Sequence, residues 1–238
     1  MAAYHLTLAD AILLVALAVV APAYSYYAGI RIGRGFLPER IRAYARTMLS
    51  WWLIALTMLF LWWRLGRPFM ALGLHVPGDP RSIAGAVLCV LMLAYMNGQW
   101  RVVARMSPEK LARVPAALGR AVAILPRTPS EYRWFLALSV TAGICEELLF
   151  RGYFLAVTSQ YLTLTGAVVA GAAIFGLGHA YQGARGIVKT GVAGVLFGAI
   201  YIATGSLVWP MILHALLDVQ GGAIAFRALR SAAPSRTG

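Results

Sequence analysis

The chain reads Cys145-Glu146-Glu147-Leu148-Leu149-Phe150-Arg151-Gly152-Tyr153 where two carboxylates and a guanidinium interrupt an otherwise apolar segment. A charge near the centre of a bilayer costs roughly 2.5 to 3.5 kcal/mol on insertion scales. Three charged side chains so close together therefore need a compensating structure or a chemical purpose. The stretch predicts a helix whose charged residues face the interior of a bundle.

The composition is that of a membrane protein. Of 238 residues, 61% are hydrophobic and 12% are charged, whereas a water-soluble domain carries about twice that share of charge. We therefore expect an all-α, polytopic transmembrane helical bundle. The 21 Lys and Arg outnumber the 8 Asp and Glu, but they lie between apolar runs, which favours lipid headgroups over nucleic acid as partners. Cys89 and Cys145 match no metal spacing and are expected to be free thiols.

About seven apolar segments have the length expected of membrane spans. They are 6–29, 48–65, 82–100, 134–157, 166–181, 186–203 and 207–226. Glycines in the fifth and sixth segments allow close helix approach, so the last four spans should form a compact bundle. Within the longest polar connection, 101–133, apolar residues recur at near-helical spacing over 111–125. This part is expected to lie along the membrane surface.

Basic residues are distributed unevenly among the connections. When Arg64 and Lys189 near the segment ends are counted with the connections, those on one side carry five, seven, two and three Lys and Arg, whereas those on the other side carry three in all. The cytoplasmic side takes the excess of positive charge. We therefore expect an integral protein of the bacterial inner membrane, with its amino terminus outside and its carboxyl terminus inside.

Helical geometry divides the charged stretch into two roles. Glu147 and Arg151 are four residues apart on one face, so they can pair and neutralise each other. Glu146 lies about 100° from Glu147 on a regular helix, which takes it off that face. The interpretation is a structural clamp between Glu147 and Arg151 beside a carboxylate, Glu146, that is free to act.

Two later spans each place a titratable residue one helical turn from a helper. Phe175 precedes His179 by four residues, and His214 precedes Asp218 by four. The Asp218 carboxylate could orient the His214 ring. Each residue also has a purely structural interpretation, as an interhelical hydrogen-bonding group or, for Phe175, as packing. Two mid-span imidazoles and two carboxylates together suffice to activate a water and stabilise an oxyanion.

These three segments, in this order, resemble the motifs EExxxR, FxxxH and HxxxN/D of the CPBP family, the CAAX-protease and bacteriocin-processing intramembrane proteases also called the Abi family. The similarity covers about 126–218 and lacks no motif position, although Asp218 stands where the prenyl-protein members usually carry Asn. It predicts a catalytic core at 126–226. The core would follow N-terminal transmembrane helices with a basic surface connection at 1–125 and precede a short basic cytoplasmic tail at 227–238.

The resemblance implies a hydrolase, an intramembrane endopeptidase that cleaves a membrane-associated protein or one bearing a leader or sorting signal. By position, Glu146 would be the general base, assisted by His179. His214 and Asp218 would hold the oxyanion or orient the water. The residues that would support this constellation are Glu147, Arg151 and Phe175.

Two mechanisms stay open at this point. Glu146, His179 and His214 form a plausible ligand set for one zinc ion, as in a metalloprotease. A glutamate-activated water with histidine donors needs no cofactor, and the chain has no HExxH helix. The sequence therefore favours the metal-free glutamic mechanism over the zinc mechanism.

The expected partners are membrane lipids and a membrane-associated protein or peptide substrate, and no nucleic acid. Two other classes of function compete with the protease. One is a non-catalytic membrane scaffold or bacteriocin self-immunity protein of the same fold. The other is a haem-binding or proton-handling protein that uses His179 and His214.

Overall fold

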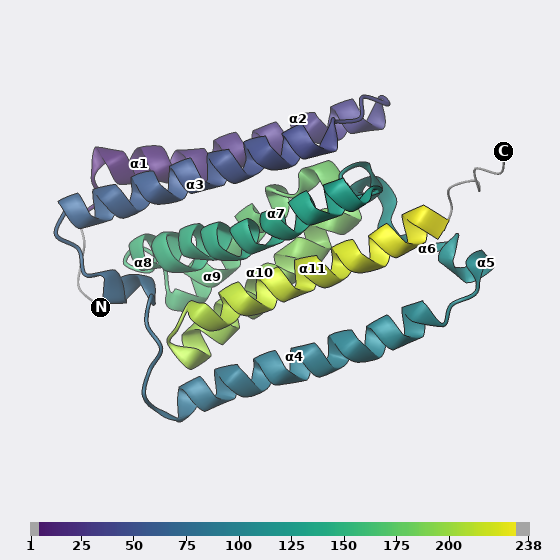
Figure 1. The fold of residues 1–238 in the computed structure, drawn as a ribbon. Coiled ribbons are helices and arrows are strands. Elements are labelled where there is room, and N and C mark those ends of the chain that lie inside the picture. Colours follow the sequence, from purple (N-terminus) through teal and green to yellow (C-terminus); the bar gives the residue numbers. More distant parts are fainter. Residues whose placement is uncertain (1–4, 232–238) are drawn as a thin grey trace.

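The computed structural model describes residues 5–231, and within that range the regular structure is entirely helical (Figure 1). The first half contains α1 (Leu8–Val15), η1 (Ala16–Val20), α2 (Ala21–Gly33), α3 (Arg40–Arg64), η2 (Phe69–Leu72), α4 (Pro80–Ala104), α5 (Pro108–Leu111), α6 (Val114–Leu118) and η3 (Gly119–Ala123). The second half contains α7 (Pro129–Glu147), η4 (Leu148–Phe154), α8 (Leu155–Thr158), α9 (Leu164–Leu177), η5 (Ala180–Gln182), α10 (Ala184–Thr204) and α11 (Val208–Ser231). The predicted all-α class is confirmed.

Each predicted span coincides with a helical segment of the structure. Among the described residues, five helices are long and apolar enough to cross a membrane, which fits an integral membrane protein. They are Leu8–Gly33, Arg40–Arg64, Pro80–Ala104, Ala184–Thr204 and Val208–Ser231. The other two segments are the 14-residue α9 and the continuous run of α7, η4 and α8. The count of seven spans stays a prediction, because α9 is shorter than the roughly 20 residues that a spanning helix needs.

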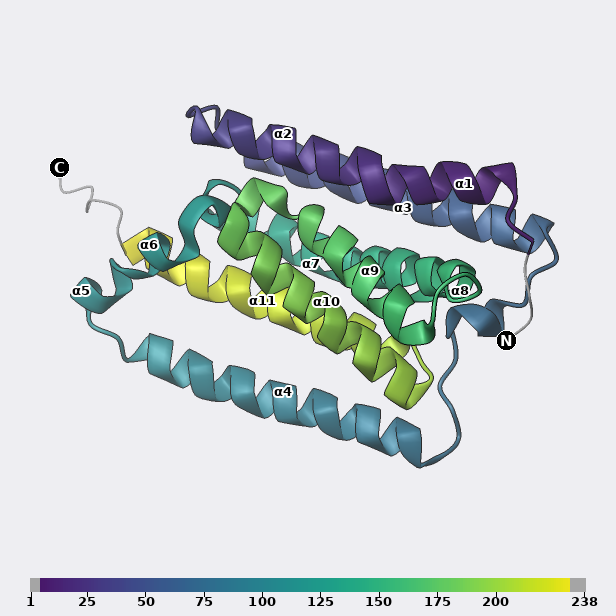
Figure 2. The ribbon, with the colours of Figure 1, turned by 180° about the vertical axis from the view of Figure 1, so that it is seen from behind.

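The helices are arranged around a central group formed by α7, α9, α10 and α11 (Figure 1). The continuous helix α1–η1–α2 and its neighbour α3 run along one side of this group, and α4 runs along the opposite side (Figure 2). Helix α3 packs on α7, and α4 packs on α11. The second half of the chain therefore forms the interior that the first half encloses.

Glycines set the distances within the central group. A Cβ added at Gly176 of α9 would lie 2.7 Å from the carbonyl oxygen of Ile187 in α10. A Cβ added at Gly143 of α7 would lie 2.8 Å from the carbonyl oxygen of Met211 in α11. Any larger residue would push these helices apart, since real Cβ atoms essentially never come so close to such an oxygen. The predicted close packing is confirmed, and Gly143 brings α7 against the turn of α11 that carries His214.

The charged stretch lies at the centre of the molecule. All seven residues of the π-helical η4 are buried. Tyr153 of η4 packs edge-on against Trp62 of α3, and Phe150 does the same against Phe175 of α9. Because η4 is enclosed on both sides, its charged neighbours are held away from lipid, as the sequence predicts.

The segment 111–125 is less regular than its apolar spacing indicates. It consists of the end of α5, then α6 and η3, separated by turns. Pro115 lies in the first turn of α6, and Gly119 ends that helix with a positive φ of 57°. These residues break what the spacing presents as a single periodic stretch. Its position at the membrane surface stays a prediction.

The connections divide between the two ends of the bundle as the alternation of charge requires. The turn from α2 to α3, the segment from α4 to α7, η5 and the end of α11 lie at one end, on the right in Figure 1. We call this the basic end. Its orientation in a membrane stays a prediction, and residues 232–238 of the expected tail lie outside the described range. Cys89 and Cys145 are free, buried thiols, as predicted.

Candidate active site

Glu147 and Arg151 form a buried ion pair inside the central group. Nη1 of Arg151 donates to Oε1 of Glu147 at 2.9 Å. The exposed fractions of these residues are 0% for Glu147 and 2% for Arg151. The pair joins the last residue of α7 to η4, so the spacing of four residues produces the contact that helical geometry predicts.

The same Glu147 oxygen accepts a second hydrogen bond, from Nδ1 of His214 at 2.8 Å. Glu147 therefore fixes the His214 ring, a role that the sequence analysis assigned to Asp218. That assignment is wrong for the ring orientation, because Oδ2 of Asp218 lies 3.8 Å from Nε2 of His214, too far for a hydrogen bond. Glu147 and His214 are 67 residues apart on different helices, and no periodicity signals their contact.

Glu146 lies near the other nitrogen of His214. Its Oε2 lies 4.0 Å from Nε2 of His214. That oxygen is buried and has no hydrogen-bond partner among the described residues. Asp218 approaches the same nitrogen from the next turn of α11, and its side chain is 42% exposed. Two carboxylates thus converge on one imidazole nitrogen, and the outer one, Asp218, faces the surface.

His179 lies outside the helix in which the sequence placed it. Helix α9 ends at Leu177, and His179 occupies the turn that leads to η5. Its Nδ1 is 2.8 Å from the carbonyl oxygen of Phe175. A carbonyl can only accept, so Nδ1 carries the hydrogen and Nε2 of the neutral ring is left as an acceptor. The mid-span position is therefore wrong, because α9 ends two residues before the histidine.

Phe175 connects the two imidazoles. Its ring centroid lies 4.7 Å from that of His179 and 6.0 Å from that of His214. The Arg151 guanidinium lies over the same ring at 4.3 Å. Phe197 of α10 stacks on His214 at 5.2 Å. Phe175 thus contacts both imidazoles, and its supporting role stays a prediction, whereas Phe197 belongs to no motif and is found only in the structure.

The ion pair is incompletely satisfied. Oε2 of Glu147 and Nη2 of Arg151 are both buried without a hydrogen-bond partner among the described residues. A Cβ added at Gly194 of α10 would lie 3.2 Å from Nη2, so this glycine leaves room beside the guanidinium. Most buried polar atoms in folded proteins are paired, so these two need an explanation such as a chemical role or a bound water.

The zinc site that the sequence offers at Glu146, His179 and His214 stays a prediction. Within residues 5–231, no group of three or more His, Cys, Asp or Glu side chains is arranged to hold a metal ion. Nδ1 of each imidazole is already bonded, to Glu147 in His214 and to the Phe175 carbonyl in His179. The Nε2 atoms are left free, which is also the arrangement of metal-ligating histidines.

Comparison with known proteins identifies the segment that contains this site. Residues 128–220 match the family model described as Type II CAAX prenyl endopeptidase Rce1-like. No curated protein and no solved structure matches the chain. The matched segment runs from the N-cap of α7 into α11 and includes Glu146, His179 and Asp218. The match confirms the predicted resemblance: residues 128–220 are similar to a family of proteases.

Proposed function

We propose that this protein is an intramembrane endopeptidase in which Glu146 activates the water that attacks a peptide carbonyl. One observation carries the proposal. Oε2 of Glu146 is buried, lacks a hydrogen-bond partner among the described residues and faces Nε2 of His214 at 4.0 Å. That separation is too long for a direct hydrogen bond and suits two groups that act on the atoms of a water or a substrate held between them. A buried carboxylate without a partner is costly, which favours a chemical role.

The proposed reaction has two stages, the attack of water and the departure of the amine, and each includes one proton transfer. Glu146 takes a proton from the water, and the water oxygen bonds to the carbonyl carbon while the carbonyl electrons move to its oxygen. Glu146 then gives the proton to the amide nitrogen, the carbon–nitrogen bond breaks and a carboxylic acid and an amine leave. The same carboxyl group serves as base and then as acid.

His214 stabilises the oxyanion in this scheme. Its Nδ1 donates to Glu147, so the ring is held with Nε2 directed at the reacting atoms. A ring protonated on both nitrogens donates from Nε2 to the developing negative charge, and the Glu147 carboxylate offsets the positive charge of that ring. Arg151 holds Glu147 in place from the other side.

His179 and Asp218 have secondary roles. The free Nε2 of His179 is an acceptor and assists Glu146 by orienting the water. Asp218, at 3.8 Å from Nε2 of His214, accepts from that nitrogen through a water and lies where a substrate enters. The substrate is a membrane-associated protein or one with a leader or sorting signal, because the site lies within a bundle of apolar helices.

The metal-free mechanism has a direct test. Purified protein is treated exhaustively with a chelator, and cleavage of a precursor peptide is compared with that by untreated protein, alongside elemental analysis. Unchanged cleavage with no bound zinc supports the glutamic mechanism. Cleavage that stops on chelation and returns with added zinc overturns it.

The test of function compares the membrane proteomes of cells that carry wild-type protein and the Glu146→Gln variant. Loss of the general base should slow cleavage by about 10² to 10⁴-fold, so an uncleaved precursor accumulates in the variant. The matched control is Glu109→Gln, which makes the same change at an exposed residue of α5. Cellular activity that survives Glu146→Gln contradicts the proposal and favours the non-catalytic scaffold.

A further inference from the structure

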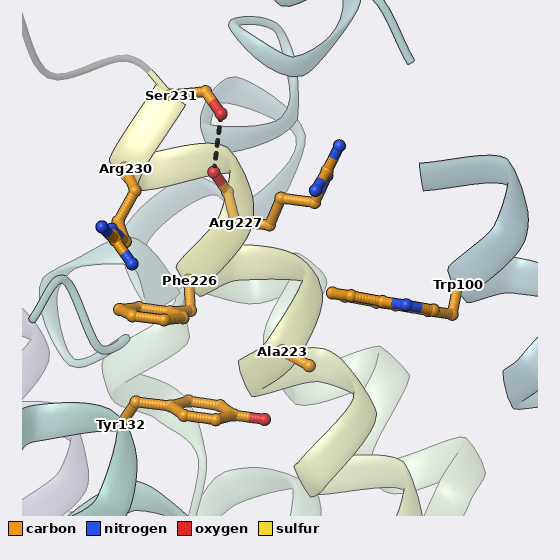
Figure 3. A pocket seen from close by; sticks show the side chains of 7 residues that line it. All are labelled: Trp100, Tyr132, Ala223, Phe226, Arg227, Arg230 and Ser231. Carbon is orange, nitrogen blue, oxygen red and sulfur yellow. Dashed lines mark hydrogen bonds between the residues drawn. The ribbon is translucent and has the colours of Figure 1, made fainter. Parts of the chain in front are cut away.

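A cavity of about 610 Å³ lies at the basic end of the bundle, away from the candidate active site (Figure 3). Helices α4, α7 and α11 surround it. It is lined by Trp100, Tyr132, Ala223, Phe226, Arg227, Arg230 and Ser231. Its volume is within the range of about 300 to 1,000 Å³ that is typical of small-molecule sites. None of the proposed catalytic residues contributes to it.

Aromatic rings form the walls of the cavity. Tyr132 of α7 and Phe226 of α11 stack face to face, with centroids 4.8 Å apart and planes at 6°. The indole of Trp100, from the end of α4, stands on the opposite side (Figure 3). Tryptophan and tyrosine gather where a membrane meets water, because their rings are apolar and their N–H and O–H groups are polar. The cavity thus has the side chains of an interfacial site.

Two arginines supply positive charge at its rim. Arg227 donates from Nε to the carbonyl oxygen of Val103 at 3.2 Å and from Nη2 to that of Ala104 at 2.8 Å. These are carbonyls of the last turn of α4, and that of Val103 also accepts from the backbone N–H of Met106 at 3.2 Å. A guanidinium has five N–H donors, so the remaining ones of Arg227 are held in place for a ligand. Arg230 lies over the Phe226 ring at 5.3 Å.

Neither arginine is neutralised by the described part of the chain. The ion pairs among residues 5–231 include neither Arg227 nor Arg230. The cavity lining contains no acidic side chain. Two unpaired guanidinium groups beside an aromatic wall are complementary to a phosphate that carries an apolar tail.

We propose that this cavity binds the headgroup of an anionic phospholipid. Arg227 points toward Trp100 and Arg230 lies on the Phe226 side of α11 (Figure 3). Arg227 therefore contacts the phosphate as a hydrogen-bond donor, and Arg230 adds positive charge at the rim. The acyl chains leave between the aromatic rings toward the apolar faces of α4 and α11. Basic pockets between transmembrane helices bind anionic headgroups by the same physics. A lipid bound here also contacts α4, α7 and α11, and so connects the outer helix α4 to the central group.

The test uses the full-length protein in nanodiscs of phosphatidylcholine with added phosphatidylglycerol, and native mass spectrometry counts the retained lipid. Wild-type protein should retain phosphatidylglycerol in preference to phosphatidylcholine. Each basic residue near an anionic membrane surface accounts for about a fivefold change in affinity. Arg230→Gln should therefore weaken retention about fivefold, and adding Arg227→Gln should weaken it about 25-fold.

Arg31→Gln is the matched control. Arg31 is also exposed at the basic end and also lies over a phenylalanine ring, that of Phe36 at 5.4 Å, but it does not line the cavity. Unchanged retention in this variant supports the proposal, and an equal loss overturns it in favour of diffuse attraction. Arg230 is exposed, so its replacement should leave folding intact, which circular dichroism checks.

Two further outcomes overturn the proposal. Equal retention of phosphatidylcholine would show that the cavity does not select negative charge. Displacement of the lipid by inorganic phosphate alone at similar concentrations would assign the site to free phosphate. Because the readout is lipid retention and not proteolysis, the result is independent of the proposed function.

Discussion

Among residues 5–231, two carboxylate–arginine pairs are buried, and they differ in how completely they are satisfied. Asp10 and Arg67 form a two-pronged pair, with Nη1 to Oδ1 at 2.8 Å and Nη2 to Oδ2 at 2.7 Å. The Asp10 carboxylate also accepts from the backbone and hydroxyl of Thr7 and from the hydroxyl of Tyr153. Arg67 further donates to the His5 carbonyl. Both carboxylate oxygens are therefore used within the protein.

The pair of Glu147 and Arg151 makes a single contact, through Oε1 and Nη1. The other oxygen of Glu147 and Nη2 of Arg151 are buried without partners among the described residues. The oxygen that is used is shared with His214. A closed network stabilises a fold, whereas an open one next to an unpaired Glu146 leaves capacity for a substrate. The two clusters each contain a carboxylate and an arginine, but only the second has unused hydrogen-bonding atoms.

The two pairs are physically connected. Tyr153 lies in η4 two residues after Arg151, and its hydroxyl donates to Oδ1 of Asp10 at 3.1 Å. The closed pair thus anchors the segment from which the open pair projects. It connects α1, the loop after α3 and η4. Its loss should therefore lower the stability of the protein without changing the reaction.

The largest expected effect is on stability, from Arg67→Met. The substitution leaves the Asp10 carboxylate buried without its cation, which should lower the free energy of unfolding by about 3–5 kcal/mol. Denaturation in detergent micelles measures it. Arg64→Met removes an exposed arginine three residues earlier and should change little. If the two variants unfold alike, the closed pair is not the anchor described above.

A smaller effect, on rate, is expected from Glu147→Gln. The amide keeps the shape but loses the charge that holds His214 as an oxyanion donor, so cleavage should slow by about 10²-fold. The measurement is the cleavage rate of the accumulated precursor, with Glu109→Gln as control. A variant that cleaves at the wild-type rate while Glu146→Gln is inactive would remove Glu147 from the mechanism.

Tyr153→Phe tests the connection between the two pairs. It deletes one hydrogen bond to a charged acceptor, which is worth about 1.5 kcal/mol of stability. The rate per folded molecule should stay unchanged, because Tyr153 contacts Asp10 and not the candidate active site. Tyr161→Phe, at a residue that is 63% exposed, is the control. A loss of rate without a loss of stability would contradict the division of roles.

The smallest effect should come from replacing the whole closed pair, as in Asp10→Leu with Arg67→Met. Apolar side chains of similar size often replace a buried ion pair within about 1 kcal/mol, so stability should return toward that of the wild type. The same treatment of the open pair, Glu147→Leu with Arg151→Met, should leave cleavage abolished even where the protein folds. Recovery of cleavage in the second double variant would show that both pairs are structural.

Features that depend on neighbours along the chain could be predicted from the sequence alone. Apolar runs located the helical segments, since each span buries its backbone in its own hydrogen bonds. The four-residue spacing of Glu147 and Arg151 placed them on one face and predicted their contact, and the 100° offset of Glu146 separated it from them. The three motifs predicted the family over the segment that the comparison later matched.

Only the tertiary structure decided which helix faces which. Glu147 meets His214 because Gly143 lets α11 approach α7, and no periodicity in either helix encodes that contact. Arg67, which has the sequence context of a loop arginine, is buried because Asp10 is held opposite it by α1. The cavity at the basic end likewise joins residues of three helices. Spacing along the chain determines which residues share one face of a helix. Packing between helices determines which residues that face contacts, and the contact of Glu147 with His214 is of this second kind.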